Sequence, residues 1–425
     1  MTNVPAPETP YVPQAIEQFV EGAASLWTLR WRLLSAPHVR LNVISRHDDR
    51  LEAFIDGLRI GGEAARLAVV DSLLADEYGA LFAAGVLAAG TADQQLTEAV
   101  IKALETQESA WPQLVSALCW LDSSRAAAVL PRLIGDSRPH LRALGVAVAG
   151  ARRTDPGPVL VRSLSDPDAH VRARAARTVG QLGRIDLMDR LKVGLSDPDP
   201  DCRFWSAWAA ARMGATQPIN VLADIAWSNQ PRADSALDIL LRRLDVAQAN
   251  TWLRELARRP ERHRSLLRAT GIIGDPLYVP WLIERMAEPV SARLAGEAFS
   301  MITGVDLASS DFVLRPPPEF PDGPNDDPAD EDVALDEDAS LPWPDPARVD
   351  EWWSANRGRF TAGTDYFLGT PKNAADWFGA LSDAYQRQRH SAALELAIRQ
   401  PAHVLFEVRA QARLQRKLLV HPRGA

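Results

Sequence analysis

A pentapeptide near the middle of the chain recurs after 31 residues. Residues 164–168 read Leu-Ser-Asp-Pro-Asp, and the same five residues return at positions 195–199. In the same register, Val171-Arg172 in the first copy becomes Cys202-Arg203 in the second. A fixed short period is typical of a solenoid, in which each unit buries its apolar face only against its neighbours. The period therefore predicts an extended array of repeats and makes a conventional enzyme fold less expected.

The clearest unit, residues 165–195, has the pattern of two short helices. Ser165 or Asp166 is expected to accept hydrogen bonds from the free N–H groups of the first helix, with Pro167 in its first turn. Gly183 is expected to end that helix. The apolar residues predicted to face inward are Val171, Ala175, Thr178, Val179 and Leu182 in the first helix, then Leu187, Met188, Leu191 and Leu195 in the second.

Diverged copies continue the pattern beyond this unit. Arg293 and Gly304 keep the spacing of eleven residues that separates Arg from Gly in both clear copies. Between residues 63 and 304, no stretch alternates apolar and polar residues in the manner of a strand. The expected fold class is all-α, an α-solenoid of helical hairpins of about 31 residues, with roughly eight units in these 240 residues.

The repeat unit itself resembles a known kind of helical repeat. Its paired helices, its Asp-rich turn and its Arg early in the first helix resemble HEAT-like repeats of the phycobilisome-lyase type. Those repeats are shorter than the standard HEAT unit, in keeping with the period of 31 residues. The resemblance implies an α-solenoid and does not imply lyase activity.

Composition divides the chain into five segments. They are a disordered N-terminus (1–13), an N-terminal helical cap (14–62), the solenoid (63–304), an acidic Pro-rich irregular segment (305–350) and a C-terminal helical region (351–425). Between Pro316 and Ala347 there are eleven Asp or Glu residues and no Lys or Arg, and nine prolines occur through Pro346. This composition disfavours packed helices. Three interpretations of the acidic run remain open: it docks on basic patches of its own chain, it stays solvated, or it binds a basic partner as a mimic of nucleic acid.

Charge and hydropathy exclude several classes of protein. The net charge is −8, and without the eleven acidic residues the rest of the chain is about +3 (−8 plus 11), so nucleic acid is not an expected partner. The longest apolar run, residues 78–90, is shorter than the roughly 20 residues that span a bilayer, and the N-terminus lacks a secretion signal. Cys119 and Cys202 are expected to be buried structural thiols. We therefore expect a cytoplasmic protein without membrane insertion.

The sequence contains no recognisable catalytic or metal-binding motif. Its eight histidines never fall four residues apart on one helix, and its paired glycines, 61–62 and 271/274, lack the context of a phosphate loop and are expected to break helices. A Gly-x-Ser-x-Gly nucleophile elbow is absent from the sequence. We predict no catalytic residue, no metal site and no cofactor, and do not expect an enzyme.

Two sets of residues are candidates for binding a protein partner. Arg172, Arg203 and Arg293 could form a positive ladder for an acidic partner, or could bond to Asp and carbonyl groups of neighbouring turns. Trp343, Trp352 and Trp353 border the acidic segment, where they could pin it onto the solenoid or contact another protein. Both interpretations of each set remain open.

Several segments together resemble an uncharacterised bacterial family of HEAT-repeat proteins, whose genes commonly accompany those of type VI secretion spike components. The matching segments are Asp49–Ala53, Asp56–Leu58, Leu81–Ala84, Pro280–Ile283, Arg293–Phe299, Leu341–Pro344, Trp352-Trp353, Gln386–Arg389 and Ala393–Leu396. The resemblance implies association with secretion machinery and supplies no catalytic residues.

Three functions follow as hypotheses. The first is a non-enzymatic scaffold or adaptor that holds a protein, such as a secretion effector or spike component, on its solenoid surface. The second is an immunity or chaperone-like protein that masks a co-encoded toxin. The third is a lyase-like modifying enzyme. The sequence does not predict an oligomeric state.

Overall fold

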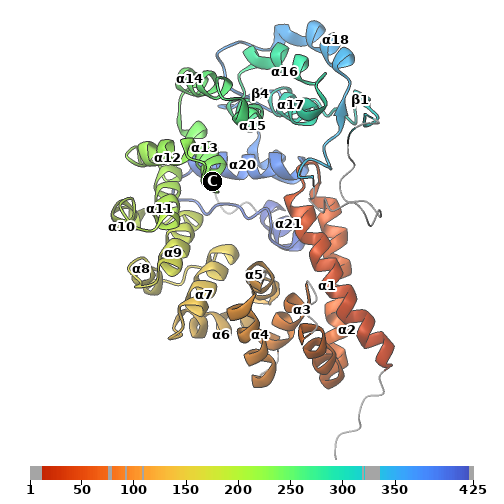
Figure 1. Ribbon diagram of the computed structural model, residues 1–425, viewed down its shortest axis with the longest axis vertical. Coiled ribbons are helices and arrows are strands. Elements are labelled where there is room, and N and C mark those ends of the chain that lie inside the picture. Colours follow the sequence, from red (N-terminus) through yellow and green to blue (C-terminus); the bar gives the residue numbers. More distant parts are fainter. Residues whose placement is uncertain are drawn as a thin grey trace, which may run out of the picture. The chain divides into compact units, whose positions relative to one another are not determined.

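The computed structural model describes residues 12–74, 79–90, 93–107, 110–317, 320 and 336–420 (Figure 1). Nearly all regular structure in these residues is helical. The described residues divide into two compact units, the first formed by those up to 34, within 42–178 and from 409 to 420, and the second by those within 35–41 and 179–408. The chain therefore passes between the units four times.

The first unit consists of helices packed around one apolar core. Trp27, Phe82 and Trp120 lie in this core. The ring centroid of Phe82 is 6.0 Å from that of Trp27 and 5.6 Å from that of Trp120. Its helices are α1 (Pro13–Ser35), α2 (Leu41–Leu74), α3 (Ala80–Gly90), α4 (Gln94–Thr106), α5 (Ala110–Trp120), α6 (Ser123–Ile134), α7 (Pro139–Arg152), α8 (Pro158–Ser163), α9 (Ala169–Leu182) up to Thr178, and α21 (Ala412–Val420). Within α2, Gly62 has a non-helical backbone (φ 52°, ψ −123°), at the helix break that the sequence predicts.

The second unit contains the rest of α9, the later repeats and most of the C-terminal region. Its helices are α10 (Met188–Gly194), α11 (Pro200–Arg212), α12 (Pro218–Trp227), α13 (Ala233–Arg243), α14 (Val246–Ala257), α15 (His263–Ile273), α16 (Val279–Arg285), α17 (Pro289–Thr303), α18 (Pro346–Asn356), α19 (Trp377–Asp383) and α20 (Gln386–Arg399). Two short antiparallel strand pairs join them: β1 (Val313–Leu314) with β2 (Trp343–Pro344), and β3 (Tyr366–Phe367) with β4 (Thr370–Pro371).

The helices from α10 to α17 form consecutive hairpins in two layers. α10 packs on α11, α12 on α13, α14 on α15, and α16 on α17. The second helices of the hairpins also pack on one another, α11 on α13, α13 on α15 and α15 on α17, so we call these four the inner layer. Close approach needs small residues: a Cβ on Gly271 of α15 would lie 3.1 Å from the Cα of Ala298 in α17. The predicted all-α solenoid is confirmed.

The turn before each repeat helix differs in detail from the prediction. The N-terminal cap of α9 is Asp168, whose carboxylate accepts the N–H of Val171 at 3.1 Å, so the expected cap at Ser165 or Asp166 was wrong. Asp166 instead accepts the N–H of Asp168 at 3.0 Å, which holds the turn ahead of the helix. The next copy repeats this arrangement at Asp197 and Asp199. Pro167 therefore lies in the turn and not inside the helix.

Glycines end several repeat helices, as predicted for Gly183. Gly183, Gly214, Gly274 and Gly304 all adopt positive φ, between 68° and 97°, a conformation that residues with a Cβ rarely take. At Gly274 a Cβ would also lie 2.1 Å from the carbonyl oxygen of Tyr366 in β3. Gly271, expected to break a helix, lies inside α15, because it is needed for helix packing and not for a turn.

Burial follows the predicted apolar stripe. Val171, Ala175, Thr178, Val179 and Leu182 of α9 are all buried, as are Leu187, Leu191 and Leu195, whereas Met188 is half-buried. Cys202 is buried and Cys119 half-buried, and neither forms a disulfide. None of the described helices combines the length and the apolar composition needed to cross a bilayer.

Candidate functional site

A C-terminal helix of the chain covers the inner layer of the second unit. α20 packs against α11 (Figure 1). Its Glu395 pairs with Arg242 of α13 at 3.0 Å. At the other end of α20, Arg387 forms an ion pair with Glu297 of α17. The inner layer of the repeats therefore already holds a helix from the same chain.

The polar contacts beneath α20 are buried. The side chains of Arg242 and Glu395 are 2% and 5% exposed, and Arg242 also donates to the hydroxyl of Ser391 at 3.0 Å. Lys372, from the segment after β4, lies 3.4 Å from Glu395 and donates to the carbonyl of Ile272 at 2.9 Å. Burial opposes ionisation of Glu395, but Lys372 and Arg242 outweigh it and lower the pKa of this carboxyl. Arg242 and Glu395 therefore each favour the charged form of the other inside the protein.

After α20 the chain continues without regular structure and contacts the ends of the repeat helices. Arg212 of α11 donates to the carbonyls of Pro401, at 3.1 Å, and of His403. The N–H of Leu405 donates to the carbonyl of Gln181 in α9 at 2.9 Å. All these contacts on residues 401–405 are to backbone groups, so the side chains of this segment do not determine them.

The described end of the acidic segment docks on the second unit. Asp336 pairs with Arg293 at 2.6 Å, Glu337 pairs with Arg264 at 3.0 Å, and Asp338 pairs with Arg264 as well. For residues 336–338 the interpretation that the acidic run docks on its own chain therefore holds. The central part of the run lies outside the described residues.

The arginines proposed as a ladder make contacts within the chain. Arg172 and Arg203 each donate through one guanidinium nitrogen to two carbonyls of the turn before their own helix, at 2.7 to 3.0 Å. Arg293 is buried and stacks over the ring of Trp343, 4.8 Å from its centroid. Each guanidinium thus stabilises the fold through contacts within the chain. Contact of these arginines with a partner stays a prediction.

The three tryptophans next to the acidic segment pack on the second unit. Trp343 in β2 is half-buried. Trp352 of α18 lies edge-on to Phe299 of α17, with ring centroids 5.7 Å apart. Trp353 is 8% exposed and lies 5.4 Å from the ring of Phe360. These contacts tie α18 to the repeats, and contact of the tryptophans with a partner stays a prediction.

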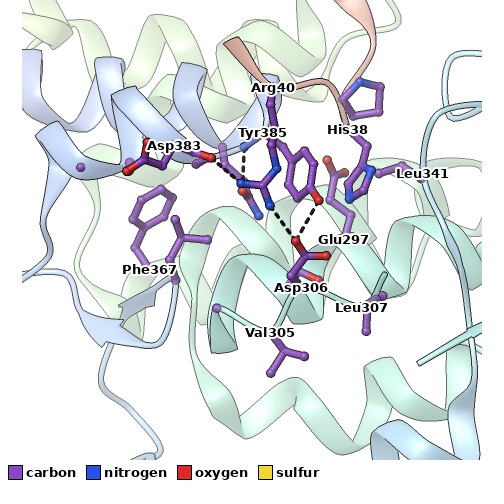
Figure 2. A pocket seen from close by; sticks show the side chains of 18 of the residues that line it. His38, Arg40, Glu297, Val305, Asp306, Leu307, Leu341, Phe367, Asp383 and Tyr385 are labelled. Atoms are coloured by element: carbon purple, nitrogen blue, oxygen red, sulfur yellow. Dashed lines mark hydrogen bonds and ion pairs between the residues drawn. The ribbon is translucent and has the colours of Figure 1, made fainter. Parts of the chain in front are cut away.

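A cavity of about 390 Å³ lies within the second unit (Figure 2). Its wall combines five parts of the chain: residues 37–40 between α1 and α2, the end of α17 with the turn that follows, residues 341–342, the β3–β4 hairpin, and α19 with the start of α20. A cavity of this size accommodates a small molecule or a large side chain.

Arg40, Asp306 and Tyr385 form the polar centre of the cavity. Arg40 donates to the carboxylate of Asp306 and to the carbonyl of Asp383, both at 2.7 Å, and stacks over the ring of Tyr385 (Figure 2). The hydroxyl of Tyr385 donates to Asp306 at 2.8 Å, and the ring of His38 stacks on that of Tyr385 at 3.6 Å. Both terminal nitrogens of the Arg40 guanidinium therefore donate hydrogen bonds, and the carboxylate of Asp306 accepts from both Arg40 and Tyr385.

Burial shifts the protonation of two groups that line the cavity. It lowers the pKa of His38, so the imidazole is neutral at pH 7. It raises the pKa of Glu297, although the neighbouring Arg387 opposes that effect. The cavity thus combines a polar centre with groups whose pKa values burial has shifted, which are features of a binding site.

Buried Arg389 holds the turn that presents Asp383 and Tyr385. Its guanidinium donates to the carbonyl of Leu381 at 2.8 Å and to the side chain of Gln386 at 2.7 Å. Burial lowers the pKa of Arg389 to about 10. The turn between α19 and α20 is therefore fixed from inside, and with it one wall of the cavity.

Sequence reasoning missed this cavity. Arg40 and Asp306 are 266 positions apart, and Asp306 and Tyr385 are 79 apart. Each is an isolated polar residue in its own segment, so no local motif marks it. Only the fold brings the three together.

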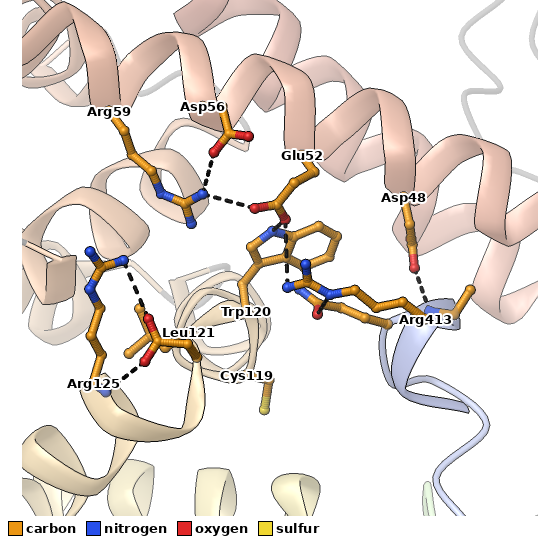
Figure 3. A network of polar contacts seen from close by, with 12 residues as sticks. Asp48, Glu52, Asp56, Arg59, Cys119, Trp120, Leu121, Arg125 and Arg413 are labelled. Atoms are coloured by element: carbon orange, nitrogen blue, oxygen red, sulfur yellow. Dashed lines mark hydrogen bonds and ion pairs between the residues drawn. The ribbon is translucent and has the colours of Figure 1, made fainter. Parts of the chain in front are cut away.

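A second polar network lies in the first unit, where α21 meets α2 (Figure 3). Asp48 accepts the N–H of Ala412, the first residue of α21, at 2.7 Å. Glu52, one turn along α2, accepts from the indole of Trp120, and Arg413 lies 3.9 Å from the same carboxylate. Carboxylates thus bind the N-terminus of α21, where the backbone N–H groups are free.

Comparison with known proteins identifies the repeats. Residues 157–240, from the loop before α8 into α13, match the family model described as HEAT repeats. No curated protein matches the chain. HEAT-repeat solenoids typically serve as protein-binding scaffolds without enzymatic activity. The hairpins and their inner layer agree with this match, which assigns HEAT repeats to residues 157–240.

Proposed function

We propose that this chain is a cytoplasmic, non-enzymatic adaptor that holds another protein on the surfaces of its HEAT repeats. The supporting observation is that the inner layer of the second unit binds a polypeptide already, in the form of α20 and residues 401–405. Buried charge pairs hold the helix, and backbone contacts hold the segment after it. Repeats that bind one segment in this way have the chemistry to bind a segment of a partner.

A secretion effector or spike component of type VI machinery is the partner class that we propose. The support is the resemblance of nine segments, from Asp49–Ala53 to Ala393–Leu396, to a bacterial family whose genes accompany spike components. Contact through Trp343, Trp352, Trp353, Arg172, Arg203 and Arg293 is part of the proposal. Trp343 is the best residue to test, because it is half-buried, whereas Trp353 belongs to the core.

Co-expression with the products of neighbouring genes tests the proposal. The full-length chain carries an affinity tag, and each co-expressed protein is followed through affinity capture and size-exclusion chromatography. We expect one spike or effector protein to co-elute in a stable complex. Trp343→Ala should weaken that complex, whereas Trp252→Ala, a substitution of another half-buried tryptophan, should leave it intact. If no neighbouring product binds, the adaptor proposal is wrong.

The same experiment distinguishes the immunity alternative. If the captured protein is toxic when expressed alone, and co-expression of this chain restores growth, masking of a toxin replaces the adaptor function. Co-elution without toxicity supports the adaptor.

One observation favours the enzyme alternative as a second candidate. His38 and Glu297, both with pKa values shifted by burial, face the same cavity. A lyase-like elimination there would use neutral His38 to take a proton from the partner and Glu297 to protonate the group that leaves it, so His38→Gln or Glu297→Gln would abolish the loss of that group, measured as a decrease in the partner's mass. A partner of unchanged mass after incubation with the wild-type chain rules this candidate out.

A further inference from the structure

Three arginines from three helices of the second unit contact the acidic residues 336–338. They are Arg264 of α15, Arg293 of α17 and Arg387 of α20, and we call them the arginine triad. α15 and α17 pack on each other in the inner layer, and Arg387 ties α20 to α17 through its ion pair with Glu297. The triad therefore belongs to the repeats and to the helix that covers them, whereas its occupant comes from another segment of the chain.

The triad carries more positive charge than the helices around it neutralise. Among the described residues of the repeats and α20, the carboxylate that pairs with the triad is that of Glu297, at Arg387. Residues 336–338 supply the other three carboxylates. Without them, Arg264 and Arg293 would lack a counter-charge among the described residues. A segment that fills this place must therefore be anionic, because any other occupant would cover guanidinium groups without pairing them.

Residues 336–338 are attached through their charges and not through apolar side chains. Their sequence is Asp-Glu-Asp, and the N–H of Asp338 donates within the stretch, to the carboxylate of Asp336 at 2.9 Å. The outermost ion pair joins Arg264 and Glu337, whose side chains are 44% and 76% exposed, and exposed ion pairs contribute little to stability. A stretch attached in this way can be exchanged for another that carries the same charges.

Asp338 fills its place in the triad incompletely. Its side chain is 5% exposed, and one of its carboxylate oxygens accepts from Arg264. The other oxygen, Oδ1, is buried without a hydrogen-bond partner among the described residues, 3.6 Å from a nitrogen of Arg387. A buried charged oxygen without a hydrogen bond lowers the stability of the state that contains it. Glutamate, which is one methylene group longer, has the reach to accept from Arg387, so a partner segment with glutamate here would fit better than the chain's own aspartate.

The occupant that the structure shows indicates an acidic polypeptide segment as the ligand. Asp336 directs its carboxylate to Arg293, and the next two residues direct theirs to Arg264. A phosphate group carries all its oxygens on one atom, whereas the triad is matched here by carboxylates on three successive residues. The chain itself thus gives the form of the ligand, a short run of Asp and Glu.

We propose that Arg264, Arg293 and Arg387 form a docking site for an acidic segment of the protein partner, and that residues 336–338 occupy this site until the partner displaces them. The inference rests on the proposed function, because it specifies the chemistry of the segment that the adaptor binds. A tethered occupant competes at a high effective concentration, so that only a segment with several adjacent carboxylates displaces it. The contact would thereby select the partner.

Hydrogen–deuterium exchange of the full-length protein tests the displacement. The probes are the peptide Gly-Asp-Glu-Glu-Gly, which has glutamate in the place of Asp338, and its neutral counterpart Gly-Asn-Gln-Gln-Gly, each at millimolar concentration. The readout is the exchange rate of the amides of Asp338, Ala339 and Leu341, which are hydrogen-bonded within the segment. We expect the acidic peptide to raise these rates severalfold and the neutral peptide to leave them unchanged.

Removing the charges of the chain's own segment should open the triad to the peptide. The triple variant Asp336→Asn, Glu337→Gln and Asp338→Asn keeps the shape of each side chain. In fluorescence anisotropy it should bind the fluorescein-labelled acidic peptide at least about tenfold more tightly than wild type, a difference of about 1.4 kcal/mol. The matched control, Asp350→Asn with Glu351→Gln, removes two exposed acidic residues of α18 and should bind the peptide like wild type.

Arg264→Gln tests the site itself, at a side chain exposed enough for the fold to tolerate the change. It should raise the exchange rates without any peptide, because Glu337 and Asp338 lose their ion-pair partner. In the background of the triple variant it should also remove the gain in peptide affinity. Arg258→Gln, at an exposed arginine that pairs with Glu255 outside the triad, is its control and should do neither.

The outcomes separate this inference from the adaptor function. Wild-type affinity of the triple variant for the acidic peptide overturns the inference, as does binding of that peptide without faster exchange at residues 338–341. Inorganic phosphate that raises the exchange rates as much as the peptide assigns the triad to a small anion and overturns it too. If wild type, the triple variant and Arg264→Gln all capture the co-expressed partner equally well, the adaptor function stands and only the docking site is wrong.

Discussion

Arg242 of α13 and Glu395 of α20 form an ion pair of 3.0 Å that is almost entirely buried. Lys372, from the segment after β4, and Ser391 of α20 also contact this pair. Removing one partner of a buried ion pair leaves the other charge buried without compensation. This lowers the stability of the folded protein more than the loss of an exposed ion pair does. This pair is therefore the contact on which the attachment of α20 to the inner layer most depends.

Glu395→Gln should lower the free energy of unfolding by about 3 kcal/mol or more, because Arg242 and Lys372 would lose the carboxylate between them. Urea denaturation followed by circular dichroism measures the change. The control is Glu255→Gln, which removes an exposed ion pair with Arg258 and should change stability by less than about 0.5 kcal/mol. Equal, small effects of both substitutions would mean that α20 is not held by its charges.

The same carboxyl makes stability depend on acidity. Although burial opposes it, Lys372 and Arg242 lower the pKa of Glu395 below that of an unfolded glutamate, about 4.3. The stabilisation is therefore fully present above about pH 4.3 and is lost as pH falls through the lower pKa of the folded state. Urea midpoints measured from pH 7 to pH 3 should fall more steeply in wild type than in Glu395→Gln. Parallel curves would contradict this assignment.

Gly274→Ala should be much more destabilising than Gly214→Ala. Both glycines end repeat helices with positive φ, and a Cβ in that conformation costs about 1–2 kcal/mol. Nothing lies within 4 Å of a Cβ at Gly214, whereas at Gly274 the Cβ would lie 2.1 Å from the carbonyl oxygen of Tyr366. We expect about 3 kcal/mol or more for Gly274→Ala, measured by urea denaturation. A similar loss at both sites would show that β3 moves away freely.

Trp353→Ala should lower the free energy of unfolding by about 3–5 kcal/mol, because it empties a buried position in the core of the second unit. Trp343→Ala should cost less, about 1–2 kcal/mol, since this ring is half-buried and its main polar contact is the cation–π stack with Arg293. Thermal unfolding by circular dichroism compares the two. If both variants have wild-type stability, the prediction is wrong, and the two tryptophans do not contribute to the fold. That outcome would leave partner binding as their role.

Most of the repeat architecture could be read from local patterns. The helix end at Gly183 and the buried stripe from Val171 to Leu182 are both as predicted, since helical spacing and left-handed glycine caps depend on neighbouring residues. The N-terminal cap was misplaced by two residues, from Asp166 to Asp168. Aspartates at both positions can accept a backbone N–H, and only the backbone conformation decides which one caps the helix.

No local sequence pattern of this kind marked the residues of the candidate site. Arg40 lies between α1 and α2, and Tyr385 lies between α19 and α20, yet both contact the carboxylate of Asp306. Helix α20 itself lacks a clear apolar stripe, because the residues buried on it include Arg389 and Glu395, whose partners are charges or carbonyls of other segments. Patterns of hydropathy do not reveal polar burial of this kind.

The 31-residue repeat by itself determined that the chain forms stacked helical hairpins, because each unit needs only its neighbours to bury its apolar face. The tertiary structure alone decided that α20 covers the inner layer and that a cavity opens around Arg40, Asp306 and Tyr385. The reason is physical. Local hydrogen bonds and helical periodicity depend on residues that are close in the sequence, whereas buried ion pairs and cavity walls combine segments that are far apart in the sequence. Only the complete fold brings such segments together.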